Sequence, residues 1–236
     1  KGCFGWWSVV FLILASRLPF WRVFKDKILR LNRRANEVPS NSHLVVDDEV
    51  KVQLTYWKTI VKMASARLPL VEHTVMFPPH AIKIYSDAAG GSLGSNNGVG
   101  ATREGNNKMN RTIIYMKWPK NIQKGDVKST CALELVAALV AVCTDIPALT
   151  RKPVVIFIDN IASCLAWRRG YSKSDVISTT LVKALFFVCT AARITLFTSH
   201  VQRCLNYESI IPDDLSKGVV DKHLLSIIGE DKIIKV

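Results

Sequence analysis

Acidic residues are scarce in this chain. Its 236 residues include 19 Asp and Glu but 32 Lys and Arg, which gives a formal net charge of +13. So large a basic excess predicts a polyanionic partner, either nucleic acid or an anionic membrane surface. The hydrophobic content of 49% argues against disorder. Acids that fall in apolar surroundings against this general trend are therefore the most informative ones.

Cysteine motifs are also lacking. Six cysteines stand at positions 3, 131, 143, 164, 189 and 204, and none forms a Cys-x-x-Cys pair. No His/Cys cluster has the spacing of a zinc site. Four of the cysteines lie in apolar helical stretches, where cysteine behaves as a small hydrophobic residue. We therefore expect an intracellular protein of the cytoplasm, the nucleus or both.

No hydrophobic run is long enough to cross a bilayer. The apolar stretch from Trp6 to Phe20 reaches Arg17 after about ten residues, whereas a spanning helix needs about 20. It has no small-residue cleavage site and only one preceding Lys, so a buried helix is favoured over a signal peptide. We expect no membrane partner. Because the chain starts without Met, we expect it to be a fragment of a longer protein.

The first 77 residues are predicted to form a helical segment. Between Phe20 and Arg34, apolar residues fall on one helical face and basic residues largely on the other. A second helix is expected from about Asp47. Its apolar residues recur at helical spacing, at Val50, Leu54, Trp57, Ile60 and Val61. The proline-containing stretch from Met76 to His80 is the best domain boundary, which gives domains of residues 1–77 and 78–236.

From Ala81 onward the pattern is that of an α/β domain. Strands are predicted at 82–87, 98–104, 111–118, 153–158 and 193–199. Helices are predicted at 129–144, from about Asn160, at 174–192 and from about Pro212. Three hairpin-type strands followed by crossovers describe a mixed five-stranded sheet with helices on both faces.

Four carboxylates occupy telling places in this pattern. Asp87 and Asp159 each end a strand, Glu134 lies in an apolar helical run, and Asp213 or Asp214 enters from the last helix. If the two strands are adjacent and parallel, their acids meet at the carboxyl edge of the sheet, where ligands of open α/β sheets bind. Small residues around Glu134 let its helix approach closely. Clustered acids in apolar surroundings require a positive partner, which predicts a divalent cation.

Each acid also has an ordinary structural explanation. Asp87 fits a turn residue, Asp159-Asn160 fits a helix N-cap, and Asp213 fits a first-turn acid that suits the helix dipole. Glu134 on an apolar helix face is harder to explain in this way. That all four acids occur together, in the order of strands and helices that such a site needs, favours a shared site.

The ordered motifs resemble the ribonuclease H domain of retroelement reverse transcriptases. The matching segments are Ile84–Ala88, Leu133–Leu139, Ile158–Asn160 with Ala162, Ser199-His200 with Asn206, and Asp213–Lys217. The last motif is closest to the Ala-Asp-x-Leu-Ser-Arg of DIRS-like and Ty3-like elements. Residues 1–75 are more weakly similar to the thumb and connection that precede this domain. The resemblance implies a ribonuclease H-like sheet of order 3-2-1-4-5.

By this resemblance, the chain hydrolyses the RNA strand of RNA–DNA hybrids. Asp87, Glu134, Asp159 and Asp213 would hold two Mg²⁺ ions, with Mn²⁺ as an alternative ion. One ion would activate the attacking water, and the other would stabilise the leaving oxygen. His200 would assist proton transfer or product release, against the ordinary reading of a solvated loop histidine.

The chain departs from the family pattern after His200. Three extra residues separate Asn206 from the acid, Ile210 stands where the family usually has Asp, and the usual Pro-Gly is absent. The role of His200 and the choice between Asp213 and Asp214 therefore stay open, although the Leu-Ser-Lys register favours Asp213.

Nucleic-acid contacts are expected from a basic loop and from polar residues near the carboxylates. The loop carries Arg168, Arg169 and Lys173 beside an aromatic residue, a composition that suits phosphate contacts as well as a solvated loop. Ser86, Asn160 and Ser163 are candidates for contact with the RNA 2′-hydroxyl. The basic face of residues 20–34 would extend the same track.

Two alternatives to the hydrolase remain. A non-catalytic nucleic-acid-binding or connection module of this fold usually loses a carboxylate, whereas this chain supplies all four. Another phosphoryl-transfer enzyme of the fold, such as an integrase or junction nuclease, fits the Asp-Leu-Ser-Lys ending less well. The expected partners are the hybrid and the polymerase portion of the same polyprotein.

Overall fold

A computed structural model gives the structure of the chain. It describes residues 37, 46–48, 50–52, 54, 55, 58, 77–90, 97–105, 111–119, 129–173, 175–202, 207–219 and 233–236. The chain divides into two units, residues 1–71 and 72–236. The apolar stretch from Trp6 to Phe20 and the amphipathic helix predicted from Phe20 to Arg34 lie outside the described residues. In the described part of the chain, no helix has the length and apolar character needed to cross a membrane.

The described part of the first unit contains the start of a helix at Asp47, as predicted. The Asp47 side chain accepts a hydrogen bond from the Val50 amide at 2.8 Å, and its carbonyl accepts one from the Lys51 amide at 3.1 Å. This is the bonding of an N-cap residue. Val50 is buried, but Leu54 on the same predicted apolar face is 45% exposed. Of the predicted stripe, the described residues Val50 and Leu54 are therefore one buried and one exposed.

The second unit is built on a mixed sheet. Its strands are β1 (Ile82–Ala88), β2 (Gly98–Arg103), β3 (Thr112–Lys117), β4 (Pro153–Ile158), β5 (Thr195–His200) and β6 (Ile233–Lys235). They lie in the order β5-β4-β1-β2-β3-β6. The pairs β1–β2 and β2–β3 are antiparallel, whereas β1–β4 and β4–β5 are parallel. This confirms the predicted strand order 3-2-1-4-5.

The sixth strand was not predicted. β6 runs parallel to β3 at the edge of the sheet, and the amide of Val236 extends this pairing to the Tyr115 carbonyl at 3.0 Å. A strand of three residues is too short to show an alternating pattern, so its assignment depends on the edge that it pairs with.

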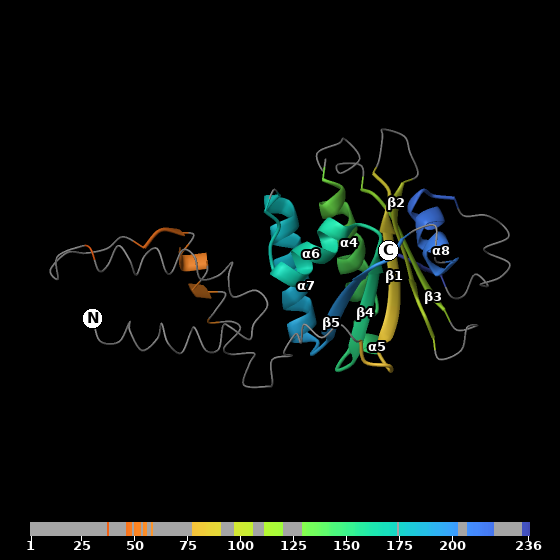
Figure 1. Ribbon diagram of the computed structural model, residues 1–236, viewed down its shortest axis with the longest axis horizontal. Helices are drawn as coiled ribbons and strands as arrows, with labels where there is room; N and C mark the ends of the chain where they lie inside the picture. The colour runs from red at the N-terminus through yellow and green to blue at the C-terminus, as the bar shows by residue number, and fades with distance from the viewer. Residues whose placement is uncertain are drawn as a thin grey trace. The chain divides into compact units, whose positions relative to one another are not determined.

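Helices cover both faces of the sheet. They are α4 (Thr130–Thr144), α5 (Ile146–Leu149), α6 (Ile161–Arg169), α7 (Val176–Ala191) and α8 (Tyr207–Ser216). The helices α4, α6 and α7 contact one another on one side, while α8 packs on β1, β2 and β3 from the other (Figure 1). The arrangement places the first turns of α4 and the end of α8 near the same end of β1.

The predicted start of the last helix was wrong. α8 begins at Tyr207, five residues before the predicted start at Pro212, which lies inside the helix. Proline is most common in the first helical turn, which is why its position suggested a start. Within α8 it removes only one backbone donor, and the rest of the helix is held by packing on the sheet.

Small side chains let α4 lie close to the sheet, as its sequence predicted. Ala132, Ala137, Ala138 and Ala141 are all fully buried. Ala137 and Leu133 pack against Ala88 of β1. The indole of Trp118 donates to the Ala89 carbonyl at 2.7 Å, which fixes the chain just beyond β1. The end of β1 is therefore held both by apolar packing and by a hydrogen bond.

The cysteines in the described ranges are all free. They are Cys131, Cys143, Cys164 and Cys189. Burial raises the pKa of the Cys164 thiol to about 11, so this side chain stays protonated and behaves as the small hydrophobic residue that the sequence indicated.

Candidate metal centre

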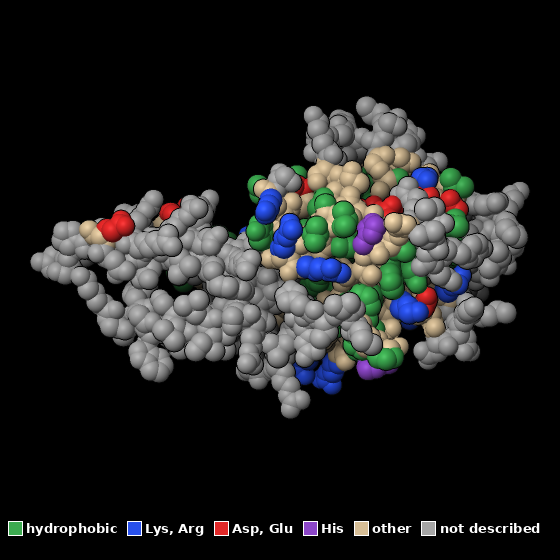
Figure 2. Space-filling model, in the orientation of Figure 1, with side chains coloured by type: hydrophobic (Ala, Val, Ile, Leu, Met, Phe, Trp, Pro, Cys, Tyr) green, Lys and Arg blue, Asp and Glu red, His purple; other side chains and the backbone are tan. Residues whose placement is uncertain are grey.

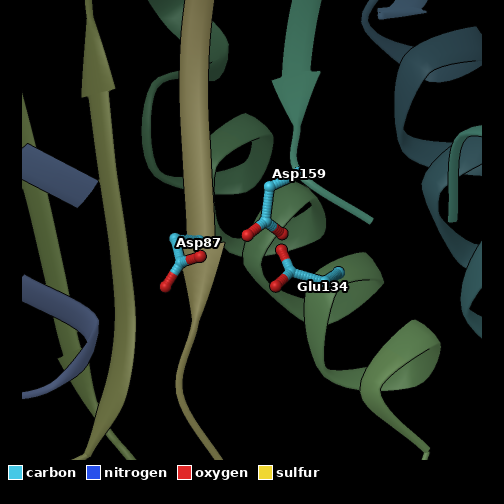
Figure 3. A group of neighbouring side chains, drawn as sticks. All are labelled: Asp87, Glu134 and Asp159. Atoms are coloured by element: carbon cyan, nitrogen blue, oxygen red, sulfur yellow. The ribbon is translucent and has the colours of Figure 1, made fainter. Parts of the chain in front are cut away.

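Three of the four predicted carboxylates converge at the carboxyl edge of the sheet. Oxygen atoms of Asp87, Glu134 and Asp159 all lie within 4.8 Å of one another (Figure 3). In the parallel ladder Ser86 pairs with Ile158. The residue after each of these is an aspartate, Asp87 within β1 and Asp159 directly after β4, so the two stand nearly level with each other. Glu134 reaches them from the second turn of α4.

The cluster is largely shielded from water. Asp87 is 4% exposed and Glu134 is 1% exposed, while Asp159 is half-buried. Two unit charges about 5 Å apart repel by roughly 3 kcal/mol at an effective dielectric constant of about 20. Three such oxygen donors fit a hard divalent cation such as Mg²⁺ or Mn²⁺ far better than a soft one. The residues present therefore match the group that the sequence implied.

The fourth predicted ligand lies outside this group. Asp213 is 8% exposed, and its Oδ2 accepts a hydrogen bond from Lys217 Nζ at 2.6 Å within an ion pair. The neighbouring Asp214 is half-buried. The structure thus brings together three of the carboxylates, and the fourth, Asp213, pairs with Lys217, the residue that follows α8.

A serine on α8 joins the cluster instead. The Ser216 hydroxyl donates to Asp87 Oδ2 at 2.5 Å, and it also lies 2.8 Å from the Asp213 carbonyl. Ser216 is fully buried. In the sequence, the Leu-Ser-Lys motif bears only on the choice between Asp213 and Asp214. The available signal was the serine three residues after Asp213, but nothing local shows which residue it contacts.

Close packing of α8 on β2 makes this contact geometrically feasible. A methyl group at Gly100 would lie 2.2 Å from the Pro212 carbonyl oxygen and 2.9 Å from the Ser216 amide nitrogen. Both separations are shorter than any carbon can tolerate, so only glycine fits. Gly100 pairs with Asp87 across the β1–β2 ladder. The missing side chain thus leaves the space through which α8 approaches Asp87.

His200 lies at the edge of the cluster. It is the last residue of β5 rather than a loop residue as predicted, and it is exposed. Its Nε2 lies 3.0 Å from the backbone carbonyl of Asp159. A carbonyl can only accept, so this contact requires a protonated Nε2. The imidazole is thereby held against the Asp159 backbone at the edge of the cluster.

A pocket adjoins the carboxylates. Its lining includes Tyr85, Ser86, Asp87, Phe157, Asp159, Val201 and Pro212. Tyr85 and Phe157 form its aromatic part, with stacked rings whose centroids are 4.7 Å apart. The buried Ser86 hydroxyl has no hydrogen-bond partner among the described residues. An unpaired buried hydroxyl costs about 1–3 kcal/mol, so a ligand or a water that satisfied it would be stabilised.

Two of the other predicted contact residues have structural partners. The Asn160 side chain caps α6 by accepting from the Ser163 amide at 3.1 Å, which is the ordinary N-cap reading. Ser163 is fully buried, and its hydroxyl donates to the Cys131 carbonyl at 3.2 Å. That hydroxyl connects α6 to the start of α4 and does not face solvent.

The predicted basic loop is at the surface, but Arg168 and Arg169 are the last two residues of α6, and only Lys173 lies beyond the helix. Arg168, Arg169 and Lys173 are all exposed. Gly170 ends the helix in the left-handed conformation, with φ of 80°. The Arg168 guanidinium donates to the Thr198 carbonyl at 3.1 Å, which anchors one of the three side chains. Figure 2 shows Lys and Arg side chains over the α6 and α7 side of this face, near a histidine and acidic side chains.

Comparison with known proteins gives matches to solved structures alone. No protein-family model matches the sequence, and no curated protein matches it. A compost-derived ribonuclease H1 aligns with 17% identity and a TM-score of 0.44, covering 61% of this chain and 98% of its own. The N-terminal ribonuclease H domain of a Mycobacterium tuberculosis protein aligns with 13% identity and a TM-score of 0.43, covering 59% and 99%. Ribonuclease H1 from the archaeon Halobacterium salinarum aligns with 14% identity and a TM-score of 0.43, covering 60% and 98%.

Proposed function

We propose that this chain is a divalent-metal-dependent endonuclease that hydrolyses the RNA strand of RNA–DNA hybrids. The observation that carries the proposal is the convergence of Asp87, Glu134 and Asp159 within 4.8 Å at the carboxyl edge of the sheet. Three carboxylates this close together, two of them buried, repel one another and serve no packing purpose, and a bound divalent cation would offset that repulsion. The basic surface beside it suits a polyanionic substrate.

Each residue of the cluster has a part in this proposal. Asp87, Glu134 and Asp159 hold the metal, with Mg²⁺ as the expected ion and Mn²⁺ as its substitute. When bound, divalent ions lower the barrier to hydrolysis by activating water and by stabilising charge on the leaving oxygen. Asp213 is the proposed fourth ligand, which requires its carboxylate to exchange Lys217 for the metal site. His200 is placed to move a proton or to assist product release.

The substrate would be held by residues around this edge. Arg168, Arg169 and Lys173 would contact backbone phosphates, which position a duplex without reading its sequence. Ser86 is one of the residues that line the pocket beside Asp87, and it is the proposed contact with a ribose 2′-hydroxyl, the group that separates RNA from DNA. Asn160 and Ser163 would support this edge by capping α6 and by tying it to α4.

The test is cleavage of a labelled RNA–DNA hybrid by the purified chain in Mg²⁺. Cleavage of the RNA strand is expected, with the DNA strand, double-stranded DNA and single-stranded RNA left intact, and with activity lost on chelation. The variants Asp87→Asn and Asp159→Asn should keep the fold and abolish cleavage. Undiminished cleavage by either variant would contradict the assignment.

A non-catalytic nucleic-acid-binding module of the same fold is the second candidate. The observation that favours it is the ion pair between Asp213 and Lys217, which occupies the fourth carboxylate. Such a module would bind the hybrid without cleaving it in Mg²⁺ or Mn²⁺. Hybrid binding without hydrolysis by the unaltered chain would therefore favour this candidate.

We also propose a retroelement reverse transcriptase as the context of the domain. This rests on the motif resemblance, above all on the Asp-Asp-Leu-Ser-Lys segment. The polymerase portion would then be encoded upstream in the same reading frame. A Tyr/Phe-x-Asp-Asp motif in that upstream sequence is the expected finding, and an unrelated upstream frame would remove this context without affecting the nuclease assignment.

A further inference from the structure

A fully buried hydroxyl on α8 bears directly on the metal cluster. Ser216 Oγ lies 2.5 Å from Asp87 Oδ2 and 2.8 Å from the Asp213 carbonyl oxygen. A hydroxyl has one proton to donate, and an anionic carboxylate is a stronger acceptor than a neutral carbonyl. The proton therefore goes mainly to Asp87, and the carbonyl serves as the weaker acceptor.

The serine is held in place by the packing of its helix. Leu215 and Ile211 form a buried cluster with Ile113 of β3, which fixes the face of α8 that meets the sheet. On the adjacent strand, Gly100 leaves no side chain between β2 and the backbone of Pro212 and Ser216. This packing holds Ser216 against Asp87, and the hydrogen bond between them sets the orientation of the Asp87 carboxylate.

We propose that Ser216 is a positioning residue that sets the orientation of Asp87 for binding a divalent cation. The inference rests on the proposed metal-dependent function. A carboxylate oxygen has two lone pairs, so accepting a hydrogen bond does not prevent the group from binding metal. Partners of this kind orient metal-binding carboxylates, and their loss typically lowers metal affinity by about 10- to 100-fold.

The experiment measures metal binding and cleavage separately in the full chain. Mn²⁺ affinity is determined by calorimetric titration for the unaltered chain, Ser216→Ala and Asp87→Asn, and cleavage is measured against Mg²⁺ concentration. Ser216→Ala should bind Mn²⁺ about 10- to 100-fold more weakly and should need a correspondingly higher Mg²⁺ concentration for half-maximal cleavage. Its maximal rate at saturating Mg²⁺ should fall much less, because all the carboxylates remain.

Ser178→Ala is the matched control. Ser178 is also a fully buried helical serine whose hydroxyl donates to a carboxylate, that of Asp175 at the start of α7. This variant loses the same type of bond away from the metal cluster. It should change thermal stability while leaving Mn²⁺ affinity within about twofold of the unaltered chain, well inside the 10- to 100-fold range of an orienting partner.

The outcomes separate the two proposals. Unchanged Mn²⁺ affinity in Ser216→Ala, with affinity lost in Asp87→Asn, would overturn the positioning role alone. An unaltered chain that binds Mn²⁺ but leaves hybrids intact would overturn the nuclease and leave the Ser216 inference to be decided by the binding constants. A chain that binds no divalent cation would overturn both. If Ser216→Ala does not fold, Ser216→Cys, which keeps a weak donor of similar size, should show an intermediate loss of affinity; full affinity would overturn the role.

Discussion

The His200 imidazole and the Asp159 backbone meet at the ends of neighbouring parallel strands, with Nε2 3.0 Å from the carbonyl oxygen. This contact keeps an exposed histidine beside the carboxylate cluster without consuming a metal-binding oxygen. A proton carrier needs such a place, close to the reacting groups and open to water.

His200→Ala should slow hybrid cleavage while leaving divalent-metal affinity unchanged. General acid–base groups typically contribute about 10²- to 10⁴-fold to a rate, so a loss of roughly 10²-fold in kcat is expected if His200 moves a proton. Single-turnover kinetics distinguishes the two roles. If His200 only assists product release, the first turnover of His200→Ala would stay fast. An unchanged kcat under both regimes would exclude either role.

Asp213 and Asp214 should differ sharply in their effect on cleavage. Asp213→Asn should lower kcat/KM at least about tenfold, since a metal ligand should matter no less than the outer partners of a metal. Asp214→Asn, one residue along α8 and only half-buried, serves as the matched variant and should stay near the unaltered activity. If Asp214→Asn lost more activity than Asp213→Asn, Asp214 rather than Asp213 would be the fourth metal ligand.

Gly100→Ala should destabilise the domain by about 1–3 kcal/mol, the usual cost of overpacking, because its methyl group would meet the backbone of α8. It should also weaken metal binding by moving Ser216 away from Asp87. Gly90→Ala is the control, since its methyl group would only touch Leu133 Cδ1 at 3.6 Å. Denaturant unfolding measures the stabilities of both variants, and equal stabilities for Gly100→Ala and Gly90→Ala would refute the close approach of α8.

Asp175 should give the domain a pH-dependent helix cap. Burial raises the pKa of Asp175, but hydrogen bonds from the Ser178 and Ser129 side chains and from the Ser178 and Ile177 amides outweigh it and lower the pKa below its ordinary value. A carboxyl whose pKa is depressed by folding stabilises the fold above its unfolded pKa and loses that contribution as the pH falls through the folded value.

The corresponding variant is Asp175→Ala. It should cost about 0.5–2 kcal/mol at neutral pH, as expected for the loss of an N-cap. The difference from the unaltered chain should shrink as the pH falls below about 3.9, the ordinary aspartate value. Urea unfolding at neutral and acidic pH measures the difference, and a constant difference across this range would show that the charge is not involved.

Arg169→Ala should weaken hybrid binding and reduce its salt dependence. One lost phosphate contact lowers the slope of log affinity against log salt by about 1. Lys152→Ala is the matched control, because Lys152 is exposed just before β4, at the opposite end of that strand from Asp159. Equal slopes for the two variants would exclude Arg169 at the end of α6 from the binding surface.

Local patterns in the sequence were enough to predict most of the elements. Strand 153–158 was predicted with its observed bounds because a continuous apolar run is typical of a strand covered on both faces. Glu134 was recognisable because a charge in an apolar helix has few structural explanations. The three-residue β6 and the start of α8 were missed, since neither carries a periodic signal of its own.

The site itself was only partly predictable. Asp87, Glu134 and Asp159 each carry a local signal, and the parallel register of β1 and β4 brings the two aspartates together. Ser163, predicted as a substrate contact, has its hydroxyl buried against the Cys131 carbonyl. Whether a polar side chain faces solvent or a neighbouring element depends on packing between elements, which spacing along the chain does not reveal.

The sequence by itself determined the strands, the helices and the acidic residues that mark the carboxyl edge, because these depend on the short periods of apolar and polar residues. Tertiary structure alone decided that Ser216, 129 residues further along the chain, donates to Asp87. Such contacts arise from the absence of a side chain at Gly100 and from the angle at which α8 packs on β2. They are properties of how elements pack on one another, and no local pattern encodes them.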